Sequence, residues 1–181
     1  MASNFARFPL PFRLGTDICR IPRMRKLLSG HNAKSLIRRV LTEEERRAAS
    51  ALLEPYMSDN PPPTPVPQTA THVEEGGIRK VAPNTKVENF MAGRFAAKEA
   101  VMKASDDRLS WHDIEIRKKE SGKPFAVIRS DAGWREALLS ISHDGDYATA
   151  TCIVAVEDAW LKESKQDGEK KEVKKAGSTW I

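Results

Sequence analysis

The spacing of apolar residues predicts one long helix in the middle of the chain. Between residues 89 and 104, Met91, Phe95 and Met102 recur at helical spacing in a segment rich in good helix formers. Glu99 falls on the same stripe, one turn after Phe95, so a carboxylate points toward the expected core. Because burying an ionised carboxylate costs several kcal/mol without compensation, Glu99 needs a partner.

Two helix starts are predicted by capping boxes, in which a hydroxyl side chain is followed three residues later by a glutamate. Thr85 and Glu88 form the box that opens the central helix. Thr42 and Glu45 form the second, which opens a shorter helix that Pro55 ends.

Alternation of apolar and polar residues predicts several short strands, with short helices between some of them. The predicted strands are 12–18, 111–117, 124–128, 139–143 and 147–156, with a hairpin turn at Asp144-Gly145-Asp146. The other predicted helices are 20–28, 33–40 and 131–138. Helices and strands mix without regular βαβ alternation, which predicts an α+β fold: a small antiparallel sheet packed by a long central helix and shorter helices.

Composition divides the chain into a domain and a tail. Residues 1–158 are expected to form one domain, interrupted by an insertion at about residues 55–84 that holds seven of the eleven prolines. This insertion has almost no large apolar residues with which to build a core. Residues 159–181 form a Lys- and Glu-rich tail, which we expect to be solvated.

Charge and cysteine content narrow the class of protein. Thirty Lys and Arg against 25 Asp and Glu give a formal charge of +5, which suits phosphate-bearing or acidic partners. Cys19 and Cys152 lie in apolar surroundings and indicate buried free thiols in a reducing compartment. There is no apolar run of about 18 residues, so no membrane association is expected. We expect a cytoplasmic protein; mitochondria are the alternative, because the first 16 residues carry Arg7 and Arg13 and no acidic residue.

Four separated motifs resemble those of one enzyme family. They are Gly15-Thr16-Asp17-Ile18, the segment Gly93–Ala100 with Lys103, Gly122-Lys123-Pro124, and Ser140-Ile141-Ser142-His143. In this order and spacing, residues 14–156 resemble the 4′-phosphopantetheinyl transferases of the small holo-acyl-carrier-protein synthase type. The resemblance implies the phosphopantetheinyl transferase fold and a role in fatty acid biosynthesis. It also implies transfer of the phosphopantetheine arm from coenzyme A to a serine of an apo acyl carrier protein, with Mg²⁺ as cofactor and adenosine 3′,5′-bisphosphate as the second product.

The resemblance implies that Asp17 and Glu99 bind Mg²⁺, an ion that typically takes one or two carboxylates beside substrate phosphates. Lys103, one turn after Glu99, would be catalytic, contacting the diphosphate and stabilising or protonating the leaving group. Either Glu99 or a metal-bound water would be the base on the serine hydroxyl. From spacing alone, Glu99 and Lys103 also fit an ordinary surface ion pair.

Further contacts to coenzyme A are implied by the resemblance. Ser142 and His143 correspond to residues that hold the 3′-phosphate, and Lys123 with Pro124 to a loop that lines the nucleotide. A lone histidine is also commonly a core residue, and the tripeptide containing Lys123 would otherwise be a simple turn.

Basic residues supply two more predicted sites. Arg94 and Lys98 are one turn apart on a different face from the expected metal ligand, and either a phosphate contact or a structural role fits them. The helix after the first strand exposes Arg20, Arg23 and Lys26, and the resemblance implies that it receives the acidic carrier protein. A merely solvated face is the alternative for these three residues.

The resemblance also implies a homotrimer with active sites between neighbouring subunits. His143 of one subunit would then complete the site that contains Asp17 and Glu99 of the next.

Two other functions stay open. A basic nucleic-acid-binding domain is suggested by the charge and by segments 20–47 and 162–175, although the few aromatic residues do not interleave with the basic ones. A Mg²⁺-dependent nucleotide hydrolase could use the same carboxylates. We expect no nucleic-acid partner.

Overall fold

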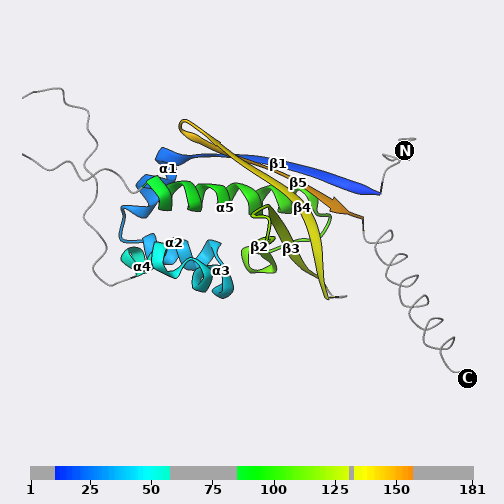
Figure 1. The fold of residues 1–181 in the computed structure, drawn as a ribbon, viewed down its shortest axis with the longest axis horizontal. Helices are drawn as coiled ribbons and strands as arrows, with labels where there is room; N and C mark the ends of the chain where they lie inside the picture. The colour runs from blue at the N-terminus through cyan, green and yellow to red at the C-terminus, as the bar shows by residue number, and fades with distance from the viewer. Residues whose placement is uncertain (1–10, 58–84, 131–132, 157–181) are drawn as a thin grey trace, which may run out of the picture.

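The sheet of this protein is antiparallel throughout and has five strands in the order β1-β5-β4-β3-β2. The computed structural model describes residues 11–57, 85–130 and 133–156 (Figure 1). Its elements are β1 (Phe12–Arg20), α1 (Ile21–Leu28), α2 (Ala33–Val40), α3 (Glu43–Ala48), α4 (Ser50–Met57), α5 (Thr85–Ala104), the 3₁₀ turn η1 (Trp111–Asp113), β2 (Ile114–Lys118), β3 (Pro124–Ser130), β4 (Gly133–Asp144) and β5 (Tyr147–Ala155). The predicted α+β class is confirmed. Most of the predicted insertion, the tail and the first ten residues lie outside the described ranges.

The central helix α5 packs between the sheet and the smaller helices. Its side facing β1 is built largely from alanines, among them Ala96, Ala100 and Ala104, all buried. The approach is close enough that a Cβ on Gly15 of β1 would lie only 2.7 Å from the backbone nitrogen of Ala104. Figure 1 shows α2, α3 and α4 on the opposite side of α5 from β1.

The other face of the sheet has an apolar row that none of the described helices covers. Leu14, Ile153, Leu138 and Phe125 are register partners across β1, β5, β4 and β3, so their side chains share one face. Leu14 is 63% and Leu138 61% exposed, and Ile18 on the same face is 61% exposed. A sheet face of this composition is typical of an interaction surface.

The structure corrects the helix predicted at residues 131–138, because β4 already begins at Gly133. Buried Arg135 and Ala137 alternate with exposed Glu136 and Leu138, which is the period of a strand. Arg135, whose buried guanidinium pairs with Asp107, sits at an inward position where sequence reasoning expects an apolar residue.

Two further boundaries differ from the predictions. The capping box of Thr42 and Glu45 is confirmed, but the helix that it opens breaks at Ala49, and Pro55 lies inside α4 instead of ending it. Residues 111–113 form a 3₁₀ turn that Ser110 caps, and the strand starts after it. The hairpin at residues 144–146 is confirmed.

The two cysteines are free and buried, as expected. Burial raises the pKa of the Cys152 thiol to about 12, which makes it unreactive at neutral pH. Within the described ranges, none of the helices combines the length and apolar character needed to traverse a bilayer.

Candidate active site

Asp17 and Lys103, which come from motifs 86 residues apart, are in direct contact. Lys103 Nζ donates a hydrogen bond to Asp17 Oδ1 at 2.7 Å and another to the carbonyl oxygen of Thr16 at 3.1 Å. Asp17 belongs to β1 and Lys103 to the last turn of α5. The close packing of α5 on Gly15 therefore brings the two motifs together.

Glu99 acts on the same cation. It lies one turn before Lys103 on α5, and its side chain is only partly buried. The hydrogen bond that Lys103 donates to Asp17 raises the pKa of the Lys103 ammonium, and the negative charges of Asp17 and Glu99 add to this effect. The expectation that Glu99 points into the core is wrong, but Glu99 and Asp17 do converge on one position of positive charge.

The donor chemistry of this position fits Mg²⁺. Two carboxylates are the usual protein contribution to a Mg²⁺ site that also binds substrate phosphates. Among the described residues, no group of three or more His, Cys, Asp or Glu side chains is placed to hold a metal ion. Asp17 and Glu99 are the carboxylates that would hold the ion, which would supply positive charge to a substrate diphosphate.

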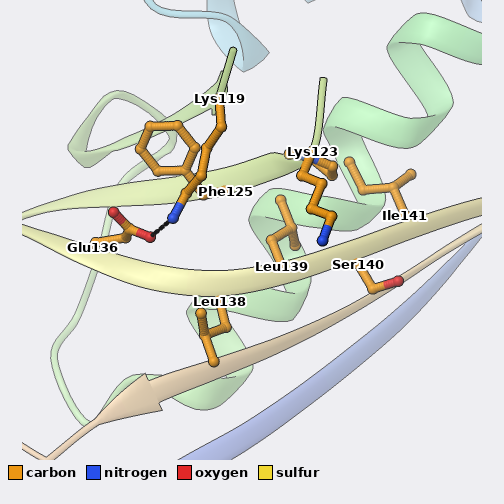
Figure 2. A pocket seen from close by; sticks show the side chains of 9 residues that line it. Lys119, Lys123, Phe125, Glu136, Leu138, Leu139, Ser140 and Ile141 are labelled. Atoms are coloured by element: carbon orange, nitrogen blue, oxygen red, sulfur yellow. Dashed lines mark ion pairs between the residues drawn. The ribbon is translucent and has the colours of Figure 1, made fainter. Parts of the chain in front are cut away.

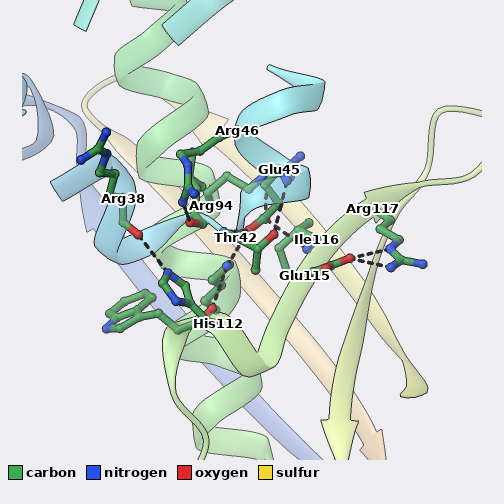
Figure 3. A network of polar contacts seen from close by, with 12 residues as sticks. Arg38, Thr42, Glu45, Arg46, Arg94, His112, Glu115, Ile116 and Arg117 are labelled. Atoms are coloured by element: carbon green, nitrogen blue, oxygen red, sulfur yellow. Dashed lines mark hydrogen bonds and ion pairs between the residues drawn. The ribbon is translucent and has the colours of Figure 1, made fainter. Parts of the chain in front are cut away.

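Lys98 lies on another face of α5, buried and paired with Glu45. Figure 3 shows the polar network around Glu45. Lys98 Nζ is 2.6 Å from Glu45 Oε2 and donates to the carbonyl oxygen of Trp111 at 2.9 Å. The same carboxylate accepts hydrogen bonds from the backbone nitrogens of Thr42 and Ile116. Desolvation lowers the pKa of Lys98, against the opposing effect of Glu45. The Lys98 side chain is 0% exposed, which favours the structural role over a contact with a coenzyme A phosphate.

Arg94 borders the same network. Its Nε is 3.5 Å from Glu45 Oε1, and its guanidinium carbon lies 4.9 Å from the ring centroid of Phe90. Arg94 and Phe90 also line a cavity of about 520 Å³ together with residues of α3 and β2. The side chain keeps 13% exposure, so its phosphate contact stays a prediction.

Lys123 and Pro124 line a different cavity, of about 340 Å³, with residues of β3 and β4 (Figure 2). Phe125 and Ser140 contribute to its wall, and Lys119 is paired with Glu136 at 2.7 Å on its rim. Its apolar and cationic lining is compatible with a nucleotide. Neither Asp17 nor Glu99 lines this cavity.

His143 lies at the opposite end of α5 from Lys103. Its Nε2 donates to the carbonyl oxygen of Asn89 at 2.9 Å, which places a proton on Nε2. Gly93 leaves room for the imidazole, because a Cβ there would come within 3.0 Å of Nε2. Glu99 follows Asn89 by ten residues, a rise of roughly 15 Å along the helix. Hence a single protomer does not bring His143, or its exposed neighbour at 142, next to the carboxylates.

The helix α1 stands beside the site. Arg20 and Lys26 are exposed, and Arg23 lies over the ring of Phe95 at 5.7 Å, one turn before Glu99. Arg25 of the same helix donates to buried Glu88 of α5 at 2.8 Å. This pair fixes α1 against α5.

Sequence reasoning missed the role of Glu45. The signal was present, because Glu45 is the glutamate of a predicted capping box, and the structure confirms that box. A capping glutamate is ordinarily a local feature of its own helix. Here its carboxylate also joins α3 to β2 and α5.

Comparison with known proteins gives a consistent result. A family model described as the 4′-phosphopantetheinyl transferase superfamily matches residues 13–152. A protein named 4′-phosphopantetheinyl transferase B, mitochondrial, from Aspergillus fumigatus is 33% identical over 160 residues, covering 82% of this chain and 96% of the relative. A holo-[acyl-carrier-protein] synthase from Shouchella clausii is 44% identical over 88 residues, covering 46% of this chain and 73% of the relative. The solved ACPS–CoA complex from Chronobacterium ammoniagenes matches with a TM-score of 0.51 and 25% identity, covering 81% of this chain and 98% of that chain.

Proposed function

This chain belongs to the 4′-phosphopantetheinyl transferase superfamily, and from that premise we propose which of its residues carry the reaction and with which ion. The enzyme transfers the phosphopantetheine group from coenzyme A to an apo acyl carrier protein. The observation that carries the residue assignment is the contact of Lys103 with Asp17 beside Glu99.

In the proposed mechanism, the serine hydroxyl of the carrier attacks the phosphorus that bears pantetheine, and the bond to adenosine 3′,5′-bisphosphate breaks. Asp17 and Glu99 hold Mg²⁺, which supplies positive charge to the diphosphate when bound. Lys103, kept protonated by its carboxylate neighbours, neutralises charge that develops on the leaving phosphate. Glu99 or water at the site takes the serine proton.

Coenzyme A is proposed to bridge two subunits. Its diphosphate and its 3′-phosphate belong to one nucleotide, whereas Glu99 and the contact of His143 with α5 are roughly 15 Å apart along the helix of one protomer. A neighbouring subunit that presents Ser142, His143, Lys123 and Pro124 to this protomer's carboxylates resolves the separation.

The uncovered sheet face supports a homotrimer. Leu14, Ile153, Leu138 and Phe125 form an apolar row across four strands, and two of its members, Leu14 and Leu138, are more than half exposed. Covering such a row by further copies of the chain would stabilise the assembly by about 25 cal/mol for each Å² of apolar surface removed from water. The same contact would bring the cavity lined by Lys123 close to a second protomer.

For the carrier, we propose an acidic acyl carrier protein of fatty acid biosynthesis that docks on Arg20, Arg23 and Lys26 of α1. The proposed compartment is the cytoplasm, with mitochondria as the alternative because the Aspergillus fumigatus relative is named mitochondrial. Microscopy of the tagged full chain in its own cells separates these two locations.

The decisive experiment is a mass measurement on a panel of apo carriers incubated with the protein, coenzyme A and Mg²⁺. We expect one carrier to gain the mass of the phosphopantetheine arm, with adenosine 3′,5′-bisphosphate appearing in equal amount and with no gain in EDTA. Consumption of coenzyme A without any carrier would instead indicate a hydrolase. Full activity in EDTA would contradict the proposed Mg²⁺ site.

A further inference from the structure

We infer that the buried pair of Glu45 and Lys98 positions Glu99, and that this pair is therefore needed for the reaction although neither residue touches a substrate. The inference rests on the proposed function, because it requires Glu99 to be a working carboxylate of the site. Lys98 is the residue directly before Glu99 in α5.

Two other elements of the fold bind Lys98 and so hold α5 in place. Lys98 Nζ is bound by Glu45 Oε2 of α3 at 2.6 Å and by the carbonyl oxygen of Trp111 in η1 at 2.9 Å. Glu45 is itself fixed by the backbone nitrogen of Ile116 in β2 at 3.1 Å. Three separate elements thus converge on one lysine of the central helix.

Fixing Lys98 fixes the rotation of α5 about its axis. With 3.6 residues per turn, residue 99 projects about 100° from residue 98, so the direction of one determines the direction of the other. The radius of a helix with its side chains is about 5–6 Å, so a rotation of roughly 10° displaces a side-chain end by about 1 Å. A displacement of that size is enough to lower a reaction rate about 100-fold.

The pair adds directional contacts to the packing of α5. The face of α5 toward β1 consists largely of buried alanines, which pack closely but make no side-chain hydrogen bond, whereas Lys98 has two fixed polar partners. The pair is also linked to α1, the helix proposed to dock the carrier. Trp111, whose carbonyl oxygen binds Lys98, packs its ring 5.0 Å from that of Phe95. Phe95 in turn lies under Arg23.

A merely stabilising role is a weaker account of the pair. A buried ion pair is often replaceable by apolar residues of similar volume with no loss of stability. Its directional contacts are what an apolar replacement cannot supply.

The test uses the full chain with Glu45→Gln and Lys98→Met combined, so that the two charges of the pair are removed together; Arg94, which also lies near Glu45, keeps 13% exposure. Folding and oligomeric state are checked by circular dichroism and light scattering. The measured quantities are kcat, the KM of each substrate, and the dissociation constant of Mn²⁺ by calorimetry, which reports on the carboxylates without turnover. We expect a folded protein with a kcat lowered about 10- to 100-fold and Mn²⁺ bound about tenfold more weakly, as for other partners that orient metal ligands.

The control variant is Arg117→Met. Arg117 pairs with the buried carboxylate of Glu115 within β2 and makes no bond to α5 among the described residues. It should lower stability while leaving kcat and Mn²⁺ binding unchanged.

A folded double variant with wild-type kcat and wild-type Mn²⁺ affinity would overturn the inference. If the double variant does not fold, Glu45→Gln alone keeps the size and shape of the side chain while removing its charge, and it should still weaken Mn²⁺ binding; an unchanged affinity there would overturn the inference equally. Failure of the wild-type chain to modify any carrier is a different result, which would refute the proposed function itself.

Discussion

Asp17 and Glu99 are the two residues on which the proposed chemistry depends, and only the folded chain brings the charges of both to Lys103. Both act on Lys103, Asp17 through a hydrogen bond and Glu99 through its charge. Asp17→Ala and Glu99→Ala should each lower kcat/KM at least about 100-fold, because each removes a ligand from an ion that contributes several kcal/mol to the transition state. Transfer is measured by the carrier mass gain.

The matched control is Asp106→Ala, since Asp106 is an exposed carboxylate that pairs with Arg13 away from Lys103. It should retain wild-type activity. Retained activity in either of the two site variants, with folding intact, would require a different pair of metal ligands.

Substitution of Gly93 by alanine tests the predicted role of His143 without removing the histidine. A Cβ at position 93 would come within 3.0 Å of His143 Nε2, and an imidazole can rotate away, whereas backbone cannot. Gly93→Ala should therefore leave the fold intact, helped by the better helix propensity of alanine, and raise the KM of coenzyme A several-fold. In a His143→Ala background the same change should have little further effect. An equal increase in both backgrounds would show that Gly93 acts independently of His143.

At the level of single residues, sequence reasoning singled out Asp17, Glu99 and Lys103 as a candidate site but misjudged which charge of α5 is buried. It followed the large apolar residues Met91, Phe95 and Met102, which put Glu99 on the inner stripe. The structure buries Met91 but leaves Phe95 and Met102 only partly buried, and it buries the alanine face together with Lys98. Alanine contributes little to a hydrophobic pattern, so the rotation of an alanine-rich helix is poorly determined by its sequence.

The contact between β1 and α5 is the packing of elements that assembles the site. Gly15→Ala would drive a Cβ into the backbone of α5, 2.7 Å from the nitrogen of Ala104 and nearer still to the carbonyl of Ala100. We expect a loss of stability of about 2–3 kcal/mol, at the upper end for overpacking, measured by denaturant unfolding. Gly30→Ala is the control, since the nearest atoms to its Cβ lie at 3.8 Å and 3.9 Å. Equal stability of the two variants would mean that β1 and α5 are less tightly packed than described.

Reversing one charge on α1 tests whether the carrier docks on this helix. Arg23→Glu reverses a charge that lies over Phe95 next to the carboxylates, and it should raise the KM of the acidic carrier at least about tenfold through lost attraction and new repulsion. The KM of coenzyme A should stay within about twofold. Arg47→Glu on α3, whose exposed side chain pairs with Glu43 and Glu44, is the charge-matched control. A parallel increase in both Michaelis constants would place Arg23 in the nucleotide site.

Most elements could be predicted from the sequence, and the exceptions have local causes. The hairpin at residues 144–146 and the capping box at Thr42 carry strong short-range signals, and both are confirmed. The first half of β4 was predicted as a helix because Arg135 breaks its apolar alternation; the ion pair with Asp107 that compensates its burial is a tertiary contact. Such long-range compensation is invisible to a pattern of neighbouring residues.

At the scale of the whole molecule, the described protomer has one uncovered sheet face, and its predicted coenzyme A and metal ligands lie at opposite ends of α5. Helices cover one face, while Leu14 and Leu138 stay exposed on the other. His143 contacts the start of α5 and Lys103 extends from its end. A complete site in one protomer and a site shared between protomers therefore make different predictions.

Complementation distinguishes them. If the site is shared, Asp17→Ala protomers lack a metal ligand but keep a sound His143, and His143→Ala protomers keep sound carboxylates. Each variant alone should have little activity, while a mixture that is unfolded and refolded together should recover part of the wild-type rate, because some interfaces then pair an intact Asp17 with an intact His143. Activity is followed by carrier mass gain and assembly by light scattering.

Leu138→Asp places a charge in the apolar row and should both dissociate the assembly and abolish this recovery. The control is Leu27→Asp on α1, where the leucine is 40% exposed, and it should leave the oligomeric state unchanged. No recovery in mixtures that do form mixed oligomers would mean that each protomer contains its own site and that His143 acts elsewhere.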